Sequence, residues 1–272
     1  MARGVTRLTR SAVFVLVYLM YLVLFMGVVH RFILIPLVWV YPVLTDRHLG
    51  SWSRLQARVP LALLRVIAGV RLDIEGAIGP EKRLVIMNHQ SLLDIFIGIS
   101  VSPRYLTLIP TRRRYAWGIP GVSTFVRLAR FPLMSQTRKG LKADLAALAQ
   151  AAERCHREEA SLLVFPEGHR TKDGTILPFM TSGLRIVLSR ARVPVYCIVG
   201  DGMWHIRTLA DMMTRVAGSH IRVRILGPFH PPQADSEISD FLASLREQMI
   251  ATLHELRAGP GEPPSPLLRD TN

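Results

Sequence analysis

Long apolar stretches without charge fill the first part of the chain. Residues 12–29 carry no charged side chain, and residues 32–44 are apolar again after the polar pair His30-Arg31. The first run is long enough for a membrane helix, whereas the second is too short to span a bilayer alone. The pattern predicts a helical hairpin, or a pair of helices lying partly in one leaflet. A single span and a buried soluble helix are the alternatives.

Beyond this segment, short apolar runs alternate with stretches of helical periodicity. In residues 140–157 the apolar positions recur every three or four residues, which places them on one face of a helix: Leu141, Leu145, Leu148, Ala152 and Cys155. The alternation predicts an α/β fold with a mixed, largely parallel sheet flanked by helices. The expected strands are 71–75, at an edge, and 84–87, 105–109, 161–165, 193–199 and 221–226; further helices are expected at 55–70, 183–190 and 236–256.

Composition divides the chain into three parts. Residues 1–58 are predicted to anchor the protein in a membrane through apolar helices. Residues 59–256 hold the α/β domain. Residues 257–272 are rich in Pro and Gly, which predicts a disordered tail.

The charged residues indicate a partner and an orientation. The chain has 34 Lys and Arg against 20 Asp and Glu, a formal net charge of +14, which favours an anionic membrane surface or a nucleic acid as partner. The positive-inside rule places both flanks of the apolar segment, and with them the α/β domain, on the cytoplasmic side. The flanking arginines are Arg3, Arg7 and Arg10 before the segment and Arg47, Arg54 and Arg58 after it.

The polar stretch 88–94 directly follows the apolar run 84–87 and contains His89, Ser91 and Asp94. A histidine at the tip of a strand, beside a helix N-terminus, is well placed for chemistry. If the helix begins at Ser91, Asp94 can accept a hydrogen bond from one ring nitrogen of His89 and leave the other nitrogen as a base. Ser91 and Asp94 also fit a capping box. The plainer alternative is that Asp94 only caps the helix and His89 is a loop residue.

A second stretch of the same kind favours the chemical interpretation. Residues 163–170, Leu-Val-Phe-Pro-Glu-Gly-His-Arg, are again an apolar strand followed by a tight turn and a charged cluster. Together the two stretches resemble the glycerolipid acyltransferase family that includes lysophosphatidic acid acyltransferases. That family carries Asn-His-x4-Asp and Phe-Pro-Glu-Gly-Thr-Arg. The first motif matches completely, and the second has His169 in the Thr position.

The resemblance implies a function and roles for the matching residues. The family transfers an acyl chain from a thioester, on coenzyme A or acyl carrier protein, to the hydroxyl of a lysophospholipid. The expected acceptor, 1-acyl-sn-glycerol-3-phosphate, would give phosphatidic acid. Carried over, His89 deprotonates the hydroxyl and Asp94 orients the ring, as in a catalytic triad whose nucleophile is the substrate. Glu167, Gly168 and Arg170 are implied to bind the acceptor. Neither a metal nor a cofactor is implied.

The sequence departs from the family where further cations are expected. The family usually has an arginine at the position of Ser135 and a lysine at that of Met180. Arg130 and Arg138 lie nearby and are candidates to bind the acceptor phosphate. Arg138 is favoured, because a helix is expected to begin near Gly140 and its N-terminus attracts anions. The two losses leave another acceptor, such as a lyso-ornithine lipid, as the close alternative.

Two functions of other classes explain less of the sequence. A nucleic-acid-binding protein accounts for the charge, but for neither the apolar N-terminus nor the paired motifs. A catalytically silent membrane-binding module is at odds with the intact His89 and Asp94. We therefore expect no nucleic-acid partner.

Overall fold

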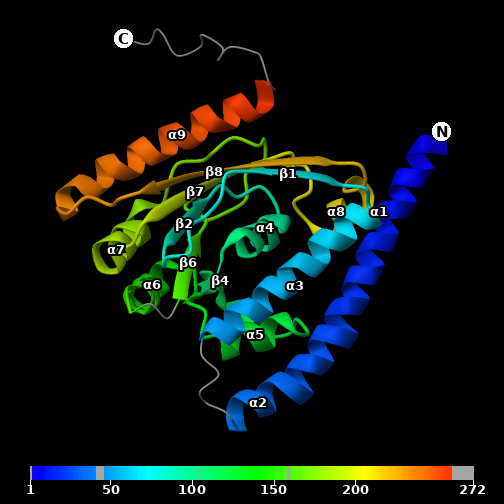
Figure 1. The fold of residues 1–272 in the computed structure, drawn as a ribbon, viewed down its shortest axis with the longest axis horizontal. Helices are drawn as coiled ribbons and strands as arrows, with labels where there is room; N and C mark the ends of the chain where they lie inside the picture. Colours follow the sequence, from blue (N-terminus) through cyan, green and yellow to red (C-terminus); the bar gives the residue numbers. More distant parts are fainter. Residues whose placement is uncertain (1, 41–45, 104, 158–159, 259–272) are drawn as a thin grey trace.

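A sheet of six strands forms the centre of the computed structural model, which describes residues 2–40, 46–103, 105–157 and 160–258 (Figure 1). Neighbouring strands are parallel except β7 and β8, which pair antiparallel. The predicted mixed, largely parallel sheet is confirmed. In spatial order the strands are β1 (Arg71–Glu75), β8 (His220–Phe229), β7 (Val195–Asp201), β2 (Leu84–Met87), β6 (Ala160–Val164) and β3 (Leu106–Leu108).

Helices flank this sheet (Figure 1). They are α4 (Leu93–Val101), α5 (Val122–Leu128), α6 (Leu141–His156), α7 (Thr181–Ala191), α8 (Leu209–Arg215) and α9 (Ile238–Ala258). A separate pair of short parallel strands joins β4 (Thr111–Arg112) to β5 (Leu133–Met134). The 3₁₀ turns η3 (Arg113–Ala116), η4 (Arg138–Gly140) and η5 (Asp235–Glu237) complete the elements of the domain.

The predicted face of α6 is correct only toward the end of the helix, where the side chains are buried: Leu148, Ala152 and Cys155. At its start, Leu141 is 52% exposed and Asp144 turns inward instead. The Asp144 carboxylate accepts hydrogen bonds from Ser135 N and Oγ, at 2.8 and 3.0 Å, and from Gln136 N at 3.0 Å. These bonds hold the loop after β5 against α6, which apolar periodicity alone cannot predict.

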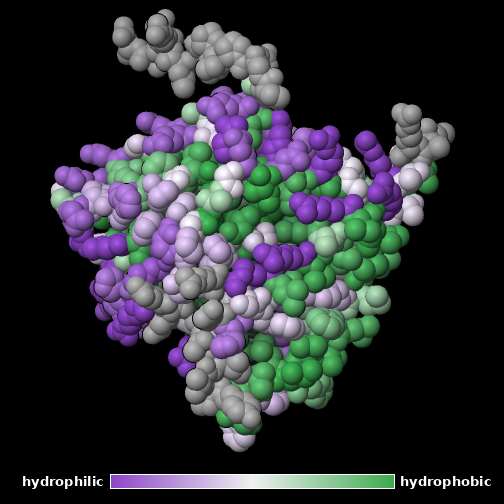
Figure 2. All heavy atoms as spheres, viewed as in Figure 1, coloured by the Kyte–Doolittle hydropathy of each residue, from purple (hydrophilic) through white to green (hydrophobic). Residues whose placement is uncertain are grey.

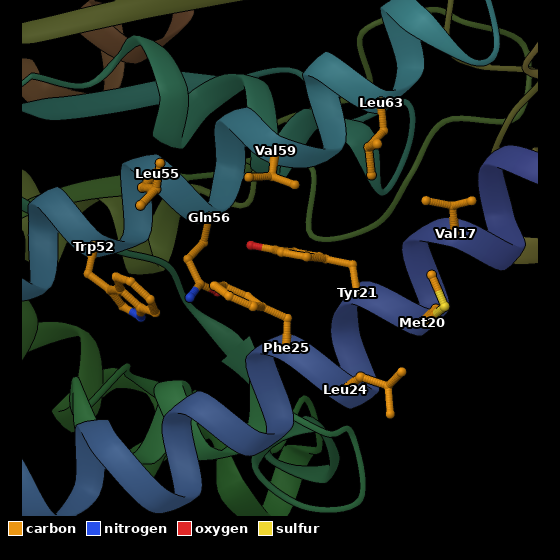
Figure 3. A pocket seen from close by; sticks show the side chains of 10 residues that line it. All are labelled: Val17, Met20, Tyr21, Leu24, Phe25, Trp52, Leu55, Gln56, Val59 and Leu63. Carbon is orange, nitrogen blue, oxygen red and sulfur yellow. The ribbon is translucent and has the colours of Figure 1, made fainter.

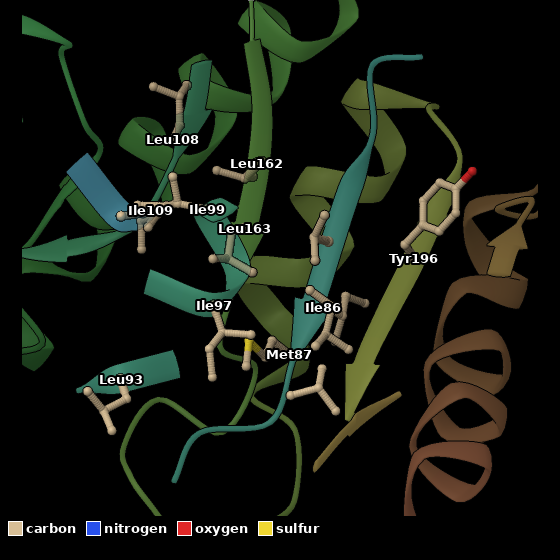
Figure 4. Close-up of a cluster of buried hydrophobic side chains, with 14 of the residues drawn as sticks. Ile86, Met87, Leu93, Ile97, Ile99, Leu108, Ile109, Leu162, Leu163 and Tyr196 are labelled. Carbon is tan, nitrogen blue, oxygen red and sulfur yellow. The ribbon is translucent and has the colours of Figure 1, made fainter. Parts of the chain in front are cut away.

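The strand β2 ends where its side chains leave the hydrophobic core between β2, β6 and α4. Side chains from all three elements converge there (Figure 4): Ile86, Met87, Ile97, Leu162 and Leu163. Gly98 allows the close approach, because a Cβ at this position would lie 2.5 Å from Leu163 Cδ2. Both faces of a parallel strand are covered, so such strands are continuous apolar runs in the sequence. The first polar residue, Asn88, therefore marks where the chain leaves the sheet.

The two apolar runs at the N-terminus form one continuous helical stretch. It consists of α1 (Ala2–Met20), the π-helical turns η1 (Tyr21–Gly27) and η2 (His30–Leu34), and α2 (Ile35–Val40). The helix Gly4–Val40 is long and apolar enough to cross a membrane. The two runs therefore do not fold back on each other as the predicted hairpin requires.

His30 explains why the polar interruption does not break this helix. Its Nδ1 donates to the carbonyl of Gly121 at 2.8 Å, and its Nε2 accepts from Trp52 Nε1 at 2.8 Å. Gln56 Nε2 lies 3.1 Å from the same ring nitrogen. The buried imidazole is thus satisfied by neighbouring elements, and the helix continues through it.

The helix α3 (Asp46–Val66) runs back beside the N-terminal helix (Figure 1). It contacts α4 and β3, and it crosses the predicted boundary at residues 58 and 59 without a break. An apolar groove of about 490 Å³ separates the two helices, lined by residues such as Tyr21, Phe25 and Val59 (Figure 3). None of the predicted site residues lines it. Figure 2 shows apolar side chains gathered over the N-terminal helix.

The predicted disordered tail overlaps the end of α9. Arg257 and Ala258 are its last residues, so for them the prediction is wrong. The Arg257 guanidinium holds this end in place, through an ion pair with Asp201 at 3.1 Å and a hydrogen bond to Gly174 O at 2.8 Å. Residues 259–272, the rest of the predicted tail, lie outside the described residues.

Candidate active site

His89 lies in the turn that follows β2, at the carboxyl end of that strand. Its Nδ1 is 2.9 Å from Oδ2 of Asp94, in the first turn of α4, so the predicted hydrogen bond is present. Because a carboxylate accepts, Nδ1 carries the proton and Nε2 has a free lone pair. The His89 side chain is 16% exposed and the Asp94 side chain is 0% exposed. The carboxylate is therefore shielded from water while the imidazole borders solvent.

Asp94 organises the whole turn. Besides the imidazole, its Oδ2 accepts the backbone N–H of Gln90 at 2.6 Å and of Ser91 at 2.8 Å. The predicted capping box is present in part. Asp94 accepts the Ser91 N–H, and Ser91 Oγ accepts the backbone N–H of Leu93 at 3.3 Å while it donates to the carbonyl of Ile206, but α4 has Leu92 at its N-cap. Three donors converge on one carboxylate oxygen, which fixes the position of the ring.

Neighbouring strands hold the same turn from outside. The Asn88 amide exchanges two hydrogen bonds with the backbone of Gly200, at 2.9 and 2.8 Å. Gln90 Oε1 accepts the backbone N–H of Met203 at 3.1 Å. The ring of Phe165 stacks on the imidazole with centroids 4.1 Å apart. The His89 ring is thus packed by the second motif and clamped to the end of β7.

Glu167 accepts backbone hydrogen bonds on both of its carboxylate oxygens. Its Oε1 accepts the backbone N–H of His89 at 2.8 Å, and its Oε2 accepts that of Leu177 at 2.9 Å. The residue is 2% exposed, and burial raises the pKa of its carboxyl group. Both oxygens accept backbone hydrogen bonds, so Glu167 positions the His89 turn.

Gly168 is required by packing in this turn. Its φ of +71° favours glycine, and a Cβ there would lie 2.4 Å from Met180 Sδ. Its carbonyl lies 3.5 Å from Gln136 Nε2, so the loop after β5 reaches the second motif. His169 is exposed. The structure thus explains Gly168 without a ligand.

Three arginines lie near one another, and one of them follows directly after the second motif's Glu-Gly-His. Arg170 is half-buried, and its Nη1 donates to the carbonyl of Arg207, in the loop between β7 and α8. Burial lowers the pKa of Arg170, and the nearby charges of Arg207 and of Arg112, on β4, lower it further. The charge of Asp94 acts in the opposite direction on the pKa of Arg170, so Arg170 lies within electrostatic reach of Asp94. Arginine stays protonated in proteins, so the site carries a concentration of positive charge.

Among the described residues, these guanidinium groups lack carboxylate partners. Within the described part of the chain, no ion pair to Asp or Glu involves Arg112, Arg170 or Arg207. Nε of Arg207 is buried without a hydrogen-bond partner there. Clustered cations without neutralising groups repel one another, and an anion between them removes that cost.

The two arginines predicted to contact a phosphate lie on either side of β5. Arg130 is exposed, with a φ of +53°, in the turn before this strand. Arg138 is exposed in η4, where Thr137 Oγ1 accepts from Gly140 N at 3.1 Å. Among the described residues, neither arginine has a hydrogen bond to Arg170 or to the His89 turn. Sequence reasoning missed Arg112 and Arg207, although Arg112 opens a conspicuous run of three arginines.

Known proteins were compared with the whole chain. Residues 73–200 match the family described as Acyltransferase. This stretch is similar to an acyltransferase domain. The predicted enzyme class is thereby confirmed, and the domain includes His89, Asp94, Glu167 and Arg170. Among the residues that the structure describes, no three His, Cys, Asp or Glu side chains form a metal-binding group.

The similarity to named relatives covers more of the chain than residues 73–200. The 1-acyl-sn-glycerol-3-phosphate acyltransferase of Saccharomyces cerevisiae is 25% identical over 223 residues, covering 79% of this chain and 69% of the yeast protein. The human 1-acyl-sn-glycerol-3-phosphate acyltransferase alpha is 27% identical over 203 residues, covering 73% and 69%. The crystal structure of the 1-acyl-sn-glycerophosphate acyltransferase PlsC from Thermotoga maritima matches with a TM-score of 0.66 at 19% identity, over 96% of this chain and 99% of that one. This last likeness shows a shared fold.

Proposed function

We propose that this protein transfers an acyl chain from acyl-coenzyme A or acyl carrier protein to the free hydroxyl of a lysophospholipid. The proposed acceptor is 1-acyl-sn-glycerol-3-phosphate, and the product is phosphatidic acid. The observation that carries the proposal is the His89–Asp94 pair, whose geometry leaves Nε2 free as a base within an acyltransferase domain. The names of the yeast and human relatives support the choice of acceptor.

The proposed reaction needs one base and no covalent enzyme intermediate. Nε2 of His89 takes the proton of the acceptor hydroxyl while that oxygen attacks the thioester carbonyl. Asp94 stabilises the resulting imidazolium through its bond to Nδ1. The tetrahedral intermediate then collapses, the carbon–sulfur bond breaks, and the imidazolium returns its proton to the thiolate. The products are an ester and a free thiol, and the base is regenerated.

The arginine cluster supplies the contact to the acceptor phosphate in this proposal. Arg170, Arg207 and Arg112 offer unpaired guanidinium donors near the base, and arginine binds phosphate oxygens in a bidentate manner. Arg130 and Arg138 remain alternative phosphate ligands on the neighbouring loop. The proposal also includes the predicted orientation, with the domain on the cytoplasmic side of a membrane, which the arginines around the apolar segment support.

A panel of acceptors tests the proposed function. The full chain is incubated in membranes with a labelled acyl donor and a set of lysolipids, and products are identified by mass spectrometry. Lysophosphatidic acid should be acylated fastest, and monoacylglycerol, which lacks the phosphate, far more slowly. A strong preference for a lyso-ornithine lipid or another acceptor without a phosphomonoester would overturn the assigned substrate. Failure to transfer to any lysolipid would overturn the proposed activity.

A further inference from the structure

Trp117 lies on the surface in a fixed orientation. It is 65% exposed, directly after η3, which is unusual for the largest apolar side chain. The guanidinium carbon of Arg127, on α5, lies 4.2 Å from the centre of its ring, and Arg127 Nη1 donates to the Ala116 carbonyl at 3.0 Å. A second pair adjoins it, with Arg114 over the ring of Tyr115 at 4.8 Å. We call Arg114, Trp117 and Arg127 the tryptophan patch.

The cations of this patch lack acidic partners among the residues that the structure describes. In the described ranges, no ion pair to a carboxylate involves Arg114 or Arg127, and both side chains are exposed. A cation stacked on an aromatic ring keeps its remaining N–H groups directed to solvent or to a ligand. The patch therefore presents apolar ring surface and unpaired positive charge side by side.

The tryptophan patch is attached to the apolar N-terminal helix. The loop that follows Trp117 ends at Gly121, whose carbonyl accepts from His30 Nδ1 at 2.8 Å. At Gly121 a Cβ would lie 2.5 Å from Met26 Cβ, so this loop lies directly against the helix between Met26 and His30. The patch is thus held at a set position along the helix.

One face of the helix packs on the protein and the other carries exposed apolar side chains. The inner face is buried at intervals of a helical turn: Phe14, Tyr18, Leu22 and Met26. The outer face is 41–61% exposed over the same span: Val13, Leu16, Met20, Val23 and Leu24. A stretch covered on one side by a folded domain cannot be surrounded by lipid, but its outer face can lie in the acyl-chain region of one leaflet. Trp and Arg beside such a helix meet the headgroup level, where Trp rings are enriched.

We infer that the tryptophan patch contacts the headgroups of an anionic bilayer. It does so while the outer face of the N-terminal helix lies in the acyl-chain region of the same leaflet. Anionic headgroups are the matching partner because the patch has unpaired cations and an interfacial ring. Tyr115, on whose ring Arg114 of the patch is stacked, lies within electrostatic reach of Arg170. Docking would bring the entrance of the site to the level at which a lysolipid presents its hydroxyl. This role for docking rests on the proposed function.

The depth of Trp117 gives the first test. The full chain is reconstituted in vesicles containing phosphatidylglycerol, with lipids brominated near the headgroup end of their acyl chains, and Trp fluorescence is compared between wild type, Trp117→Phe and Trp204→Phe. Trp204 is the control, because it is also partly exposed but lies beside Gly174 and Arg257, at the end of α9 remote from α5 (Figure 1). Bromine should quench a component that Trp117→Phe removes and Trp204→Phe retains. An equal Trp117 component in brominated and plain vesicles would overturn the inference.

Rates on two forms of the acceptor give the second test. Arg127→Gln should lower acyl transfer to long-chain lysophosphatidic acid in anionic vesicles about 5-fold at low salt, since each arginine near an anionic surface adds roughly that factor in binding. Transfer to a short-chain, monomeric acceptor should be unchanged, and Arg185→Gln, on α7, should match wild type in both. Equal losses with both acceptors would contradict the inference. No transfer by wild type to either acceptor would instead refute the proposed function, and the quenching result would still decide the docking.

Discussion

The two sides of the active site differ in how their polar groups are satisfied. Around the imidazole, Asp94 Oδ2 accepts three hydrogen bonds, and Glu167 accepts a backbone N–H on each oxygen. On the arginine side, Arg170 donates to the Arg207 carbonyl. Nε of Arg207, like Oδ1 of Asp94, is buried without a hydrogen-bond partner among the described residues. The His89 turn is held by several hydrogen bonds within the protein, whereas the arginines have donor groups left for a ligand.

On this account, the position of the proposed base is fixed before the substrate binds, whereas the arginines find their partner only when the substrate binds. A base must be positioned before the reaction, because its proton transfer depends on a distance set in advance. A cluster of cations is stabilised most when an anion binds, because the anion offsets the mutual repulsion of the arginines. Substitutions on the imidazole side should therefore lower turnover, and substitutions on the arginine side should weaken acceptor binding.

The largest effect is expected from removing the base. His89→Ala should lower turnover by about 10²–10⁴ and leave the protein folded and membrane-bound, since positioned general bases contribute factors of this size. Thioester consumption and membrane sedimentation of the variant, measured beside wild type, check both parts. Near-full turnover by His89→Ala would show that the rigid side of the site does not supply the base.

An intermediate effect is expected from Glu167→Gln. A glutamine offers one acceptor oxygen, so the backbone N–H of either His89 or Leu177 loses its partner, at about 1–3 kcal/mol of stability. Turnover should fall with little change in the Michaelis constant for the acceptor, because the variant moves the base and not the arginines. A change confined to the Michaelis constant would return Glu167 to the acceptor-binding role that the sequence suggested.

The pH dependence of stability sharpens the same test. Burial raises the pKa of the Glu167 carboxyl, so the folded state holds this proton more tightly than the unfolded chain. Its contribution to stability is complete below the ordinary pKa of glutamate and is lost as the pH rises through the raised value. Glu167→Gln lacks this titration, so the stability difference between the two proteins should move in favour of the variant as the pH rises. Denaturant unfolding at several pH values measures it.

The smallest changes in turnover are expected on the arginine side. Arg207→Gln and Arg112→Gln should each raise the Michaelis constant for lysophosphatidic acid roughly 10–100-fold, the equivalent of one charge-assisted hydrogen bond of about 1.5–3 kcal/mol. Arg138→Gln and Arg130→Gln are the matched variants from the loop around β5. If Arg138→Gln and Arg130→Gln raise this Michaelis constant while Arg207→Gln and Arg112→Gln match wild type, the phosphate binds against the loop around β5.

The sequence predicted the imidazole side well and the arginine side poorly, for a physical reason. The strand 84–87 was located to the residue because a parallel strand covered on both faces is a continuous apolar run. The contact of His89 with Asp94 follows from their short separation, which a single turn bridges. Arg207 contacts Arg170 because β2 alone separates β7 from β6 in the sheet, so the loops that follow β7 and β6 can meet.

The N-terminal segment shows the same limit. The sequence shows that the segment is apolar, but it does not show the hydrogen-bond partners of His30. These are Gly121 and Trp52, which lie far from His30 in the sequence or on another helix. Without them, a polar pair between two apolar runs indicates a break, and the hairpin prediction followed. The inward turn of Asp144 in α6 likewise depends on the backbone of a distant loop. Local spacing predicts local contacts, and these packing contacts are not local.

The central claim is that Asp94 holds the His89 ring with its proton on Nδ1 and leaves Nε2 free. Nitrogen-15 NMR of histidine-labelled protein measures this directly, with the His89 signals assigned by their loss in His89→Gln. In the neutral ring, we predict a protonated Nδ1 and an unprotonated Nε2, and a mixture of both forms in Asp94→Asn. A neutral ring in wild type with its proton on Nε2 would contradict the account, because that nitrogen could not then take the proton of the acceptor hydroxyl.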